Sequence, residues 1–126
     1  MNSLLQKSNT TQSATVAAIV VTFNRLDKLK TVLASIEKQT RLPDQLIIVN
    51  NASTDGTAKY LEEYAQSFAS DSVKLSIVTL DRNRGGAGGF SAGMLRGYEL
   101  GADYVWIFDD DGYPQPNALE KVFAGY

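Results

Sequence analysis

The chain has 126 residues, of which 44% are hydrophobic and 21% charged, and its formal net charge is -2 at pH 7. This length and composition fit one globular domain, and the weakly acidic balance excludes nucleic acid as an expected partner. Because the chain has neither cysteine nor histidine, it cannot form disulfides, zinc-thiolate sites, imidazole metal sites or Ser-His dyads. The lack of cysteine suits a cytoplasmic protein.

The amino terminus differs in composition from the rest of the chain. Residues 1–13 are rich in Ser, Thr, Asn and Gln and lack a long apolar segment, so we expect a flexible tail and not a signal peptide. Residues 14–126 are the predicted domain, with no internal repeat or linker. The longest apolar run, VAAIVV, is far shorter than the roughly 20 residues of a membrane-spanning helix, so no span is expected.

The first half of this domain alternates strand and helix patterns. The apolar, β-branched run Val16 to Phe23 is typical of a strand buried on both faces, and Asn24 is predicted to cap the next helix. Apolar positions recur at helical spacing along that helix (Leu26, Leu29, Val32, Leu33, Ile36) until RLPD ends it. QLIIVN, residues 45–50, predicts a second buried strand. Ser53 or Thr54 is predicted to cap a second helix, with inner residues Leu61, Tyr64, Ala65 and Phe68.

The second half continues the alternation. VKLSIVTL (residues 73–80) predicts a third strand and DRNRGGAGG (residues 81–89) a glycine-rich loop. A third helix is marked by Phe90, Met94, Leu95 and Tyr98 and ends at Gly101; the fourth strand runs from Tyr104 to Phe108. Asn117 is predicted to cap a last helix, with Glu120 at the capping-box position. This order predicts an α/β fold: a mainly parallel sheet with helices on both faces.

Polar segments follow every predicted strand: TFNR (22–25), NNASTDG (50–56), DRNRGGAGG (81–89) and DDDG (109–112). Ligands bind sheets of this kind outside the carboxyl ends of the strands. Backbone N–H groups of the glycine loop can bind phosphate, and Arg82 and Arg84 favour an anion there. A glycine-rich turn also serves simply to let a loop pass closely over a strand, and this alternative stays open.

Three adjacent aspartates, Asp109, Asp110 and Asp111, repel one another at the end of the fourth strand. A divalent cation, Mg²⁺ or Mn²⁺, would offset the repulsion and bridge to a diphosphate; an acidic turn in solvent beside Pro114 is the alternative. Other motifs do not fit. No G-x-G-x-x-G follows the first strand, no G-K-S/T occurs, and Pro114 stands where an EF-hand loop needs glycine.

The segments VVTFNR, IIVNNASTDGT, NRGGAGGFSAG and WIFDDDG resemble the family 2 glycosyltransferases, enzymes of the GT-A fold, in order and spacing from Val16 to Val122. The resemblance implies a Rossmann-like nucleotide-binding half, a UDP- or dTDP-linked sugar donor, a divalent metal, and transfer to a saccharide or lipid-linked acceptor with inversion. The doubled glycines before Phe90 look like the galactofuranosyl- and rhamnosyltransferase branches.

The same resemblance implies roles for single residues. Those matching the segment that borders the nucleoside are Thr22, Phe23, Asn24 and Arg25. Asn51 stands where the family usually has a base-contacting aspartate, and an amide there can still pair with a base edge. Asp55 and Gly56 match the end of the STDGT turn. The residues expected near the ribose and sugar are Asn83, Arg84, Gly85, Gly86 and Gly89; Asp109 and Asp110 are expected beside the diphosphate, and Asp109 and Asp111, the ends of the D-x-D motif, on the metal.

In this family the general base lies well beyond the D-x-D turn, so no catalytic residue is expected in this chain, and Glu120 is a poor candidate. We therefore expect the donor-binding half of a longer enzyme, with apolar surface along the last strand and helix that favours self-association. Two other functions stay open: a non-catalytic nucleotide-sugar-binding module and a sugar nucleotidyltransferase. The latter needs a glycine-rich loop and a basic residue directly after the first strand, where TFNR supplies only Arg25.

Overall fold

A computed structural model describes residues 14–109 and 114–124. Within them, the strands form a four-stranded sheet in the order β3-β2-β1-β4, and all neighbouring strands are parallel. The strands are β1 (Val16–Thr22), β2 (Gln45–Asn50), β3 (Lys74–Thr79) and β4 (Tyr104–Asp109); the helices are α1 (Leu26–Glu37), α2 (Thr57–Ser67), α3 (Gly85–Glu99) and α4 (Ala118–Ala124). The predicted tail and residues 110–113 of the aspartate turn lie outside the described residues.

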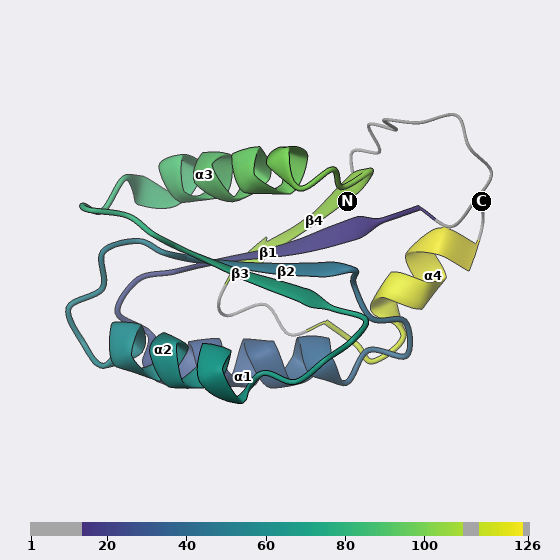
Figure 1. The fold of residues 1–126 in the computed structure, drawn as a ribbon, viewed down its shortest axis with the longest axis horizontal. Helices are drawn as coiled ribbons and strands as arrows, with labels where there is room; N and C mark the ends of the chain where they lie inside the picture. Colours follow the sequence, from purple (N-terminus) through teal and green to yellow (C-terminus); the bar gives the residue numbers. More distant parts are fainter. Residues whose placement is uncertain (1–13, 110–113, 125–126) are drawn as a thin grey trace.

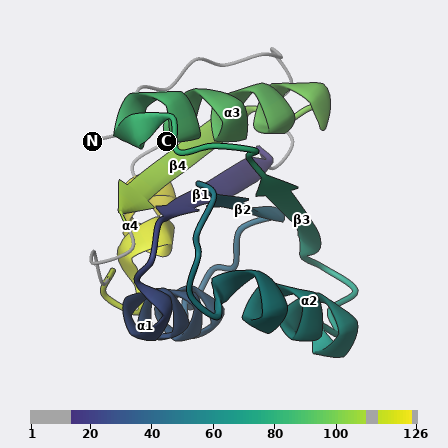
Figure 2. The ribbon, with the colours of Figure 1, turned by 90° about the vertical axis from the view of Figure 1, so that its left-hand side faces the viewer.

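The helices form a layer on each side of the sheet. Helices α1 and α2 cover one face and α3 covers the other (Figures 1 and 2). This arrangement confirms the predicted α/β fold with helices on both faces. Helix α4 lies at the end of the sheet where the strands begin (Figure 1) and is tied to the end of α1, because the side chain of Gln39 accepts a hydrogen bond from the N–H of Leu119 at 3.1 Å.

Alternation of side chains along β1 and β2 divides the core in two. One set faces α1 and α2 and packs against their large aliphatic side chains; it comprises Ala18, Val20, Leu46 and Ile48, with Leu29, Val32, Leu33, Ile36 and Leu61 from the helices. The other set, Ala17, Ile19, Ile47 and Val49, lies on the α3 side. Both strands are apolar on both faces because both faces are covered, as predicted.

Helix α3 begins earlier than predicted and packs through residues that the sequence pattern did not indicate. It begins at Gly85, so the predicted glycine loop forms the first turn of the helix. Its buried residues are Gly89, Gly93 and Gly97, whereas the apolar residues that marked it, Met94, Leu95 and Tyr98, are 38%, 58% and 71% exposed. A Cβ atom at Gly93 would lie 2.4 Å from Cγ2 of Ile19. The helix therefore lays its backbone on the sheet, and glycine carries no hydrophobic signal that could have shown this face.

The predicted caps of α1 and α2 are wrong. Arg25 precedes α1 and Gly56 precedes α2, and neither helix has a side-chain cap. Asn24 has a left-handed backbone, with φ of 51°, and its side chain is occupied elsewhere. Within α4, the carboxylate of Glu120 accepts a hydrogen bond from the hydroxyl of Thr40, which adds a second link between α4 and the segment after α1. No helix in the described ranges has the length and apolar content needed to cross a bilayer.

Candidate functional site

The polar segments after the strands meet at one edge of the sheet. In the parallel register Thr22 pairs with Asn50, Asn50 with Thr79, and Val21 with Asp109, so the carboxyl ends of all four strands lie level. Figure 2 views the molecule from this edge, with the segments that follow β1, β2 and β3 side by side. The structure thus brings together three of the four selected segments, and the fourth strand ends beside them at Asp109.

Asn24 connects the segment after β1 to the segment after β2. Its side-chain oxygen accepts hydrogen bonds from the N–H groups of Thr54 at 2.7 Å and Asp55 at 3.2 Å. Its amide nitrogen donates to the hydroxyl of Thr54 at 3.3 Å, and its own backbone N–H donates to Oγ of Ser53 at 3.0 Å. Four hydrogen bonds therefore hold two segments that are about thirty positions apart in the sequence.

Asn51 connects the segment after β2 to the start of α3. Its side chain is buried, with an exposed fraction of 3%. Its oxygen accepts from the N–H of Arg84 at 2.9 Å, and its amide nitrogen donates to the carbonyl of Gly85 at 3.0 Å. The base contact that the resemblance implies for Asn51 stays a prediction; in this structure the amide orients the first turn of α3.

The predicted phosphate glycines fall into two groups. A Cβ atom at Gly89 would lie 2.5 Å from Cγ1 of Val21 and 3.5 Å from Nδ2 of Asn51, so this glycine is required by close packing on the sheet. Gly85 has a φ of 74°, which favours glycine, and its N–H donates to Oδ1 of Asn83 at 2.8 Å. A Cβ atom at Gly86 would meet nothing within 4 Å. Packing among the described residues gives no reason for glycine at this position.

The remaining predicted residues lie around the same edge. Thr22 is buried, and its carbonyl accepts from the N–H of Asn51 at 2.9 Å. Phe23 is a large apolar side chain with 40% of its surface exposed. The guanidinium of Arg84 lies 3.4 Å from a carboxylate oxygen of Asp81, with both side chains exposed. An exposed aromatic ring and a cation are thus available to a ligand.

Asp55 closes the turn before α2. Its Oδ1 accepts from the N–H of Thr57 at 3.0 Å and from the hydroxyl of the same residue, and that hydroxyl lowers the pKa of Asp55 below its ordinary value. A shallow cavity of about 380 Å³ lies between this turn and the start of α1, and it is lined by Asn24, Arg25, Leu26, Asp27, Lys28 and Asp55. Asp55 therefore stabilises the turn before α2 and does not cap the helix, which has no side-chain cap.

Of the two predicted metal ligands, the structure describes only the backbone of Asp109. The backbone of Asp109 ends β4 beside Val21 of β1, whereas Asp110 and Asp111 lie outside the described residues. Among the side chains that are described, no three acidic residues gather closely enough to hold a cation. The metal assignment of Asp109 and Asp111 stays a prediction.

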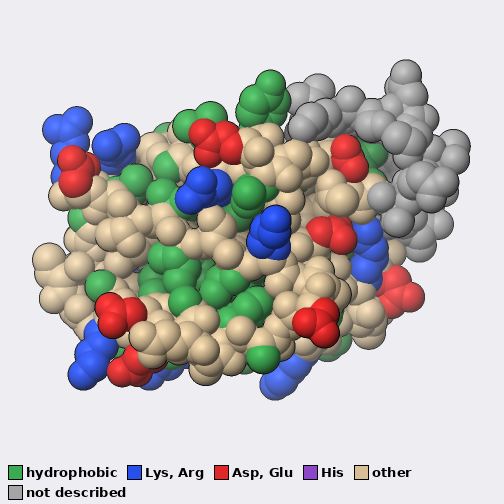
Figure 3. Space-filling model, in the orientation of Figure 1, with side chains coloured by type: hydrophobic (Ala, Val, Ile, Leu, Met, Phe, Trp, Pro, Cys, Tyr) green, Lys and Arg blue, Asp and Glu red, His purple; other side chains and the backbone are tan. Residues whose placement is uncertain are grey.

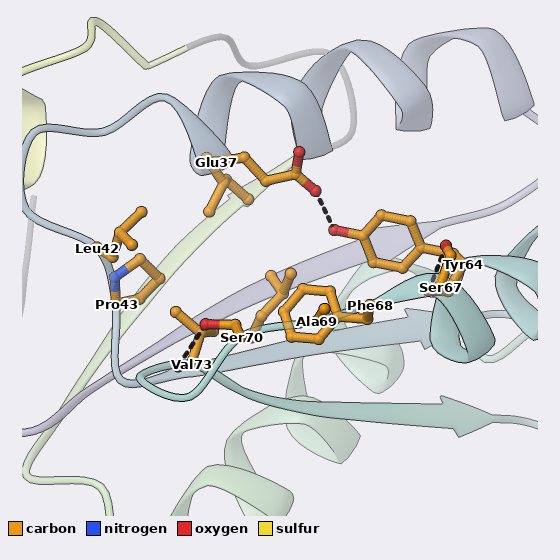
Figure 4. A pocket seen from close by; sticks show the side chains of 11 residues that line it. Glu37, Leu42, Pro43, Tyr64, Ser67, Phe68, Ala69, Ser70 and Val73 are labelled. Atoms are coloured by element: carbon orange, nitrogen blue, oxygen red, sulfur yellow. Dashed lines mark hydrogen bonds between the residues drawn. The ribbon is translucent and has the colours of Figure 1, made fainter.

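A second cavity lies at the other end of the sheet and was not predicted from the sequence. Its volume is about 530 Å³, and its walls come from the end of α1, the end of α2 and the segments before β2 and β3. Hydrophobic side chains also gather on the surface between β3 and α2 (Figure 3). The hydroxyl of Tyr64 donates to Glu37 across this cavity (Figure 4), and burial raises the pKa of Tyr64 above its ordinary value. Its residues are separate from the segments that follow the strands.

Comparisons with known proteins agree with this geometry. A family model described as "Glycosyl transferase family 2" matches residues 17–125, so the chain belongs to this family. It is 43% identical to the galactofuranosyltransferase GlfT1 of Mycobacterium tuberculosis over 100 residues, covering 79% of this chain and 31% of the relative. It is 38% identical to GlfT1 of Mycolicibacterium smegmatis over 104 residues, covering 82% of this chain and 32% of the relative. The chain spans about a third of the length of these curated relatives.

Solved structures show the same fold. A crystal structure of TarS from S. aureus in complex with UDP has a TM-score of 0.69 and 25% identity, over 87% of this chain and 31% of that one. The mannosyltransferase PcManGT from Pyrobaculum calidifontis, in complex with GDP-Man and Mn²⁺, has a TM-score of 0.67 and 26% identity, over 82% of this chain and 29% of that one. The sheet and helices described above are therefore those of GT-A glycosyltransferases.

Proposed function

We propose that this chain is the donor-binding part of an inverting glycosyltransferase that takes its sugar from a nucleotide diphosphate. One observation carries the proposal: three of the four segments that resemble the family follow parallel strands and meet at one edge of the sheet, and β4 ends beside them at Asp109. Ligands of open α/β sheets bind at this edge. TarS and PcManGT, which share the fold, are known in complex with UDP and with GDP-Man.

Individual groups at this edge suit the parts of such a donor. The half-exposed ring of Phe23 offers a face on which a nucleobase can stack. No atom of the described residues would lie within 4 Å of a Cβ atom at Gly86, so a ligand can approach the backbone at the start of α3. Arg84 is close enough to this backbone to add positive charge, although it also pairs with Asp81. UDP-galactofuranose is the first donor to test, because of the 43% identity to a galactofuranosyltransferase.

We also propose that Asp109 and Asp111 hold Mn²⁺ or Mg²⁺. Carboxylate oxygens are the ligands these cations prefer, and Asp109 stands at the same edge of the sheet as the glycine-rich turn. The cation would neutralise charge that develops on the leaving diphosphate. In a protein as long as the relatives, the general base and the acceptor site would come from the two thirds that this chain does not cover. We expect such an enzyme to act in the cytoplasm, either free or at the inner face of the membrane.

Binding measurements test both proposals. We expect UDP to bind with Mn²⁺ and to bind much more weakly without it, and Asp111→Ala to abolish the response to Mn²⁺ in calorimetry. Asp71→Ala removes the same charge from an exposed position before β3, at the other end of the sheet, and should leave binding unchanged. Equal UDP affinity and Mn²⁺ response in Asp111→Ala and in the unmodified chain would refute the metal assignment.

A second variant separates binding from packing at the glycine-rich turn. Gly86→Ala adds a methyl group where nothing lies within 4 Å, and alanine favours a helix over glycine by about 1 kcal/mol. We therefore expect equal or higher thermal stability together with weaker UDP binding. Unchanged UDP affinity would show that the donor does not pass over Gly86. A non-catalytic module, the main alternative, would bind UDP in the same way but would give no transfer activity even in the full-length protein.

A further inference from the structure

The hydrogen bonds of Asn24 leave little of its side chain for a ligand. The carbonyl oxygen of an asparagine has two lone pairs, and both are used by the N–H groups of Thr54 and Asp55. One of the two amide hydrogens is donated to the hydroxyl of Thr54. Asn24 was expected to border the nucleoside, yet nearly all the hydrogen-bonding positions of its side chain are used by the segment after β2.

The backbone supports the same interpretation. Asn24 has φ of 51° and Ala52 has φ of 62°, so two residues that are not glycine adopt the left-handed conformation in segments that touch. Such a conformation costs about 1–3 kcal/mol outside glycine, and asparagine tolerates it better than most residues. Strain of this kind persists where the surrounding structure fixes it. Here the fixing contacts are those that Asn24 makes with Ser53, Thr54 and Asp55.

The segment that Asn24 holds is itself connected to α3. Oδ1 of Asn50, a residue with 1% exposure, accepts from the N–H of Ser53 at 3.0 Å. The next residue, Asn51, bonds Arg84 and Gly85. A continuous set of hydrogen bonds thus runs from the end of β1, through the segment after β2, to the first turn of α3.

We propose that Asn24 is a positioning residue: it fixes the segment after β2, and with it the start of α3, in the conformation that binds the donor, without contacting the donor through its own side chain. This inference rests on the proposed function of the same edge of the sheet. A segment held in place before binding loses less entropy when the ligand arrives, so the gain is in affinity. Fixing the loop in advance also accounts for an asparagine at a strained backbone position.

The test uses the 126-residue chain with UDP and Mn²⁺. Asn24→Gly removes the side chain and relieves the backbone strain, so we expect a stable fold whose melting temperature changes little. UDP should bind about tenfold more weakly. Asn24→Asp keeps the oxygen that accepts from Thr54 and Asp55, and should restore most of the affinity. As a matched control, Thr40→Ala deletes a hydrogen bond between two elements at the opposite end of the sheet and should leave UDP binding unchanged.

Hydrogen exchange of the ligand-free chain distinguishes positioning from direct contact. In Asn24→Gly the amides of Thr54 and Asp55 should exchange about tenfold faster or more, because they lose their acceptor before any ligand is present. If these amides exchange at the original rate, or if Asn24→Gly binds UDP as tightly as the unmodified chain, the positioning role is overturned. An unmodified chain that binds no UDP would overturn the proposed function instead, and the exchange rates would still report whether Asn24 fixes the segment.

Discussion

The two faces of the sheet are covered in opposite ways. On one face, α1 and α2 reach the sheet through fully buried leucine, valine and isoleucine side chains. On the other, α3 reaches it through Gly89, Gly93 and Gly97 and turns larger apolar residues to the outside. Packing on the first face stabilises the fold by burying apolar surface area, whereas packing on the second face brings the backbone of α3 close to the strands. Close approach at Gly89 is what lets Asn51 bond the first turn of α3.

The largest expected effect is on the aliphatic face. Leu33→Ala deletes a side chain with 1% exposure in the middle of the α1 interface, and we expect a loss of about 2–5 kcal/mol in the free energy of unfolding. Urea denaturation followed by circular dichroism measures this loss. A loss well under 1 kcal/mol would mean that this face is loosely packed and would remove the contrast with α3.

A smaller but more specific effect is expected on the glycine face. Gly93→Ala places a methyl group 2.4 Å from Cγ2 of Ile19, a fully buried residue, and overpacking of this kind costs about 1–3 kcal/mol. Gly97→Ala is the matched control on the same helix, because its nearest contacts are at 3.5 Å. Alanine there should be neutral or stabilise by up to about 1 kcal/mol through helix propensity.

The two alanine variants separate two explanations of the glycines. If space is the reason, unfolding experiments will show a loss for Gly93→Ala and none for Gly97→Ala. If both variants lose stability equally, the glycines serve some other purpose, such as flexibility of α3, and the close-approach interpretation fails.

Tyr64 of α2, which packs on the aliphatic face, allows a test with a smaller expected effect: the dependence of folding stability on pH. Burial, followed by the hydrogen bond to Glu37, raises the pKa of Tyr64 above the ordinary value of a tyrosine, about 10. The folded state therefore prefers the neutral phenol; this contribution is complete below pH 10 and is lost as pH rises through and above the unfolded value. Tyr64→Phe should cost about 1 kcal/mol at pH 7 and should reduce the fall in stability above pH 10.

An alkaline profile for Tyr64→Phe that overlays the unmodified one would show that Tyr64 does not control this part of the pH dependence.

Local sequence patterns predicted the elements well where side chains report burial. Strand β2 was predicted with the bounds observed, because QLIIVN is buried on both faces and carries a continuous apolar signal. The inner face of α3 could not be predicted in the same way. Glycine contributes nothing to an apolar pattern, so Phe90, Met94, Leu95 and Tyr98 indicated the helix but not the side that packs.

The shared location of the polar segments was predicted, but the hydrogen bonds that connect them were not. Parallel strands place their carboxyl ends together whatever the details, so the polar segments could be selected from the sequence. The partners of Asn24 and Asn51 could not, because they depend on which segments become neighbours and on a left-handed backbone at Asn24. The side chain of Asn24 could have capped α1, but it accepts hydrogen bonds from Thr54 and Asp55 instead.

The smallest expected effect concerns the outer side of α3. Leu95 is 58% exposed, so Leu95→Gln should change the free energy of unfolding by about 0.5 kcal/mol or less, in contrast to Leu33→Ala. Self-association was predicted to involve the last strand and helix, where Ile107 is 38% exposed, yet α3 also presents exposed Met94, Leu95 and Tyr98. Unfolding at low and high protein concentration, with sedimentation velocity, distinguishes the two surfaces. If Leu95→Gln is neutral at low concentration but reduces association at high concentration, contacts between copies involve α3. If only Ile107→Gln reduces it, they involve β4, and the outer face of α3 is simply solvated. A loss of several kcal/mol in Leu95→Gln at low concentration would contradict the orientation of α3, because it would require that Leu95 is buried.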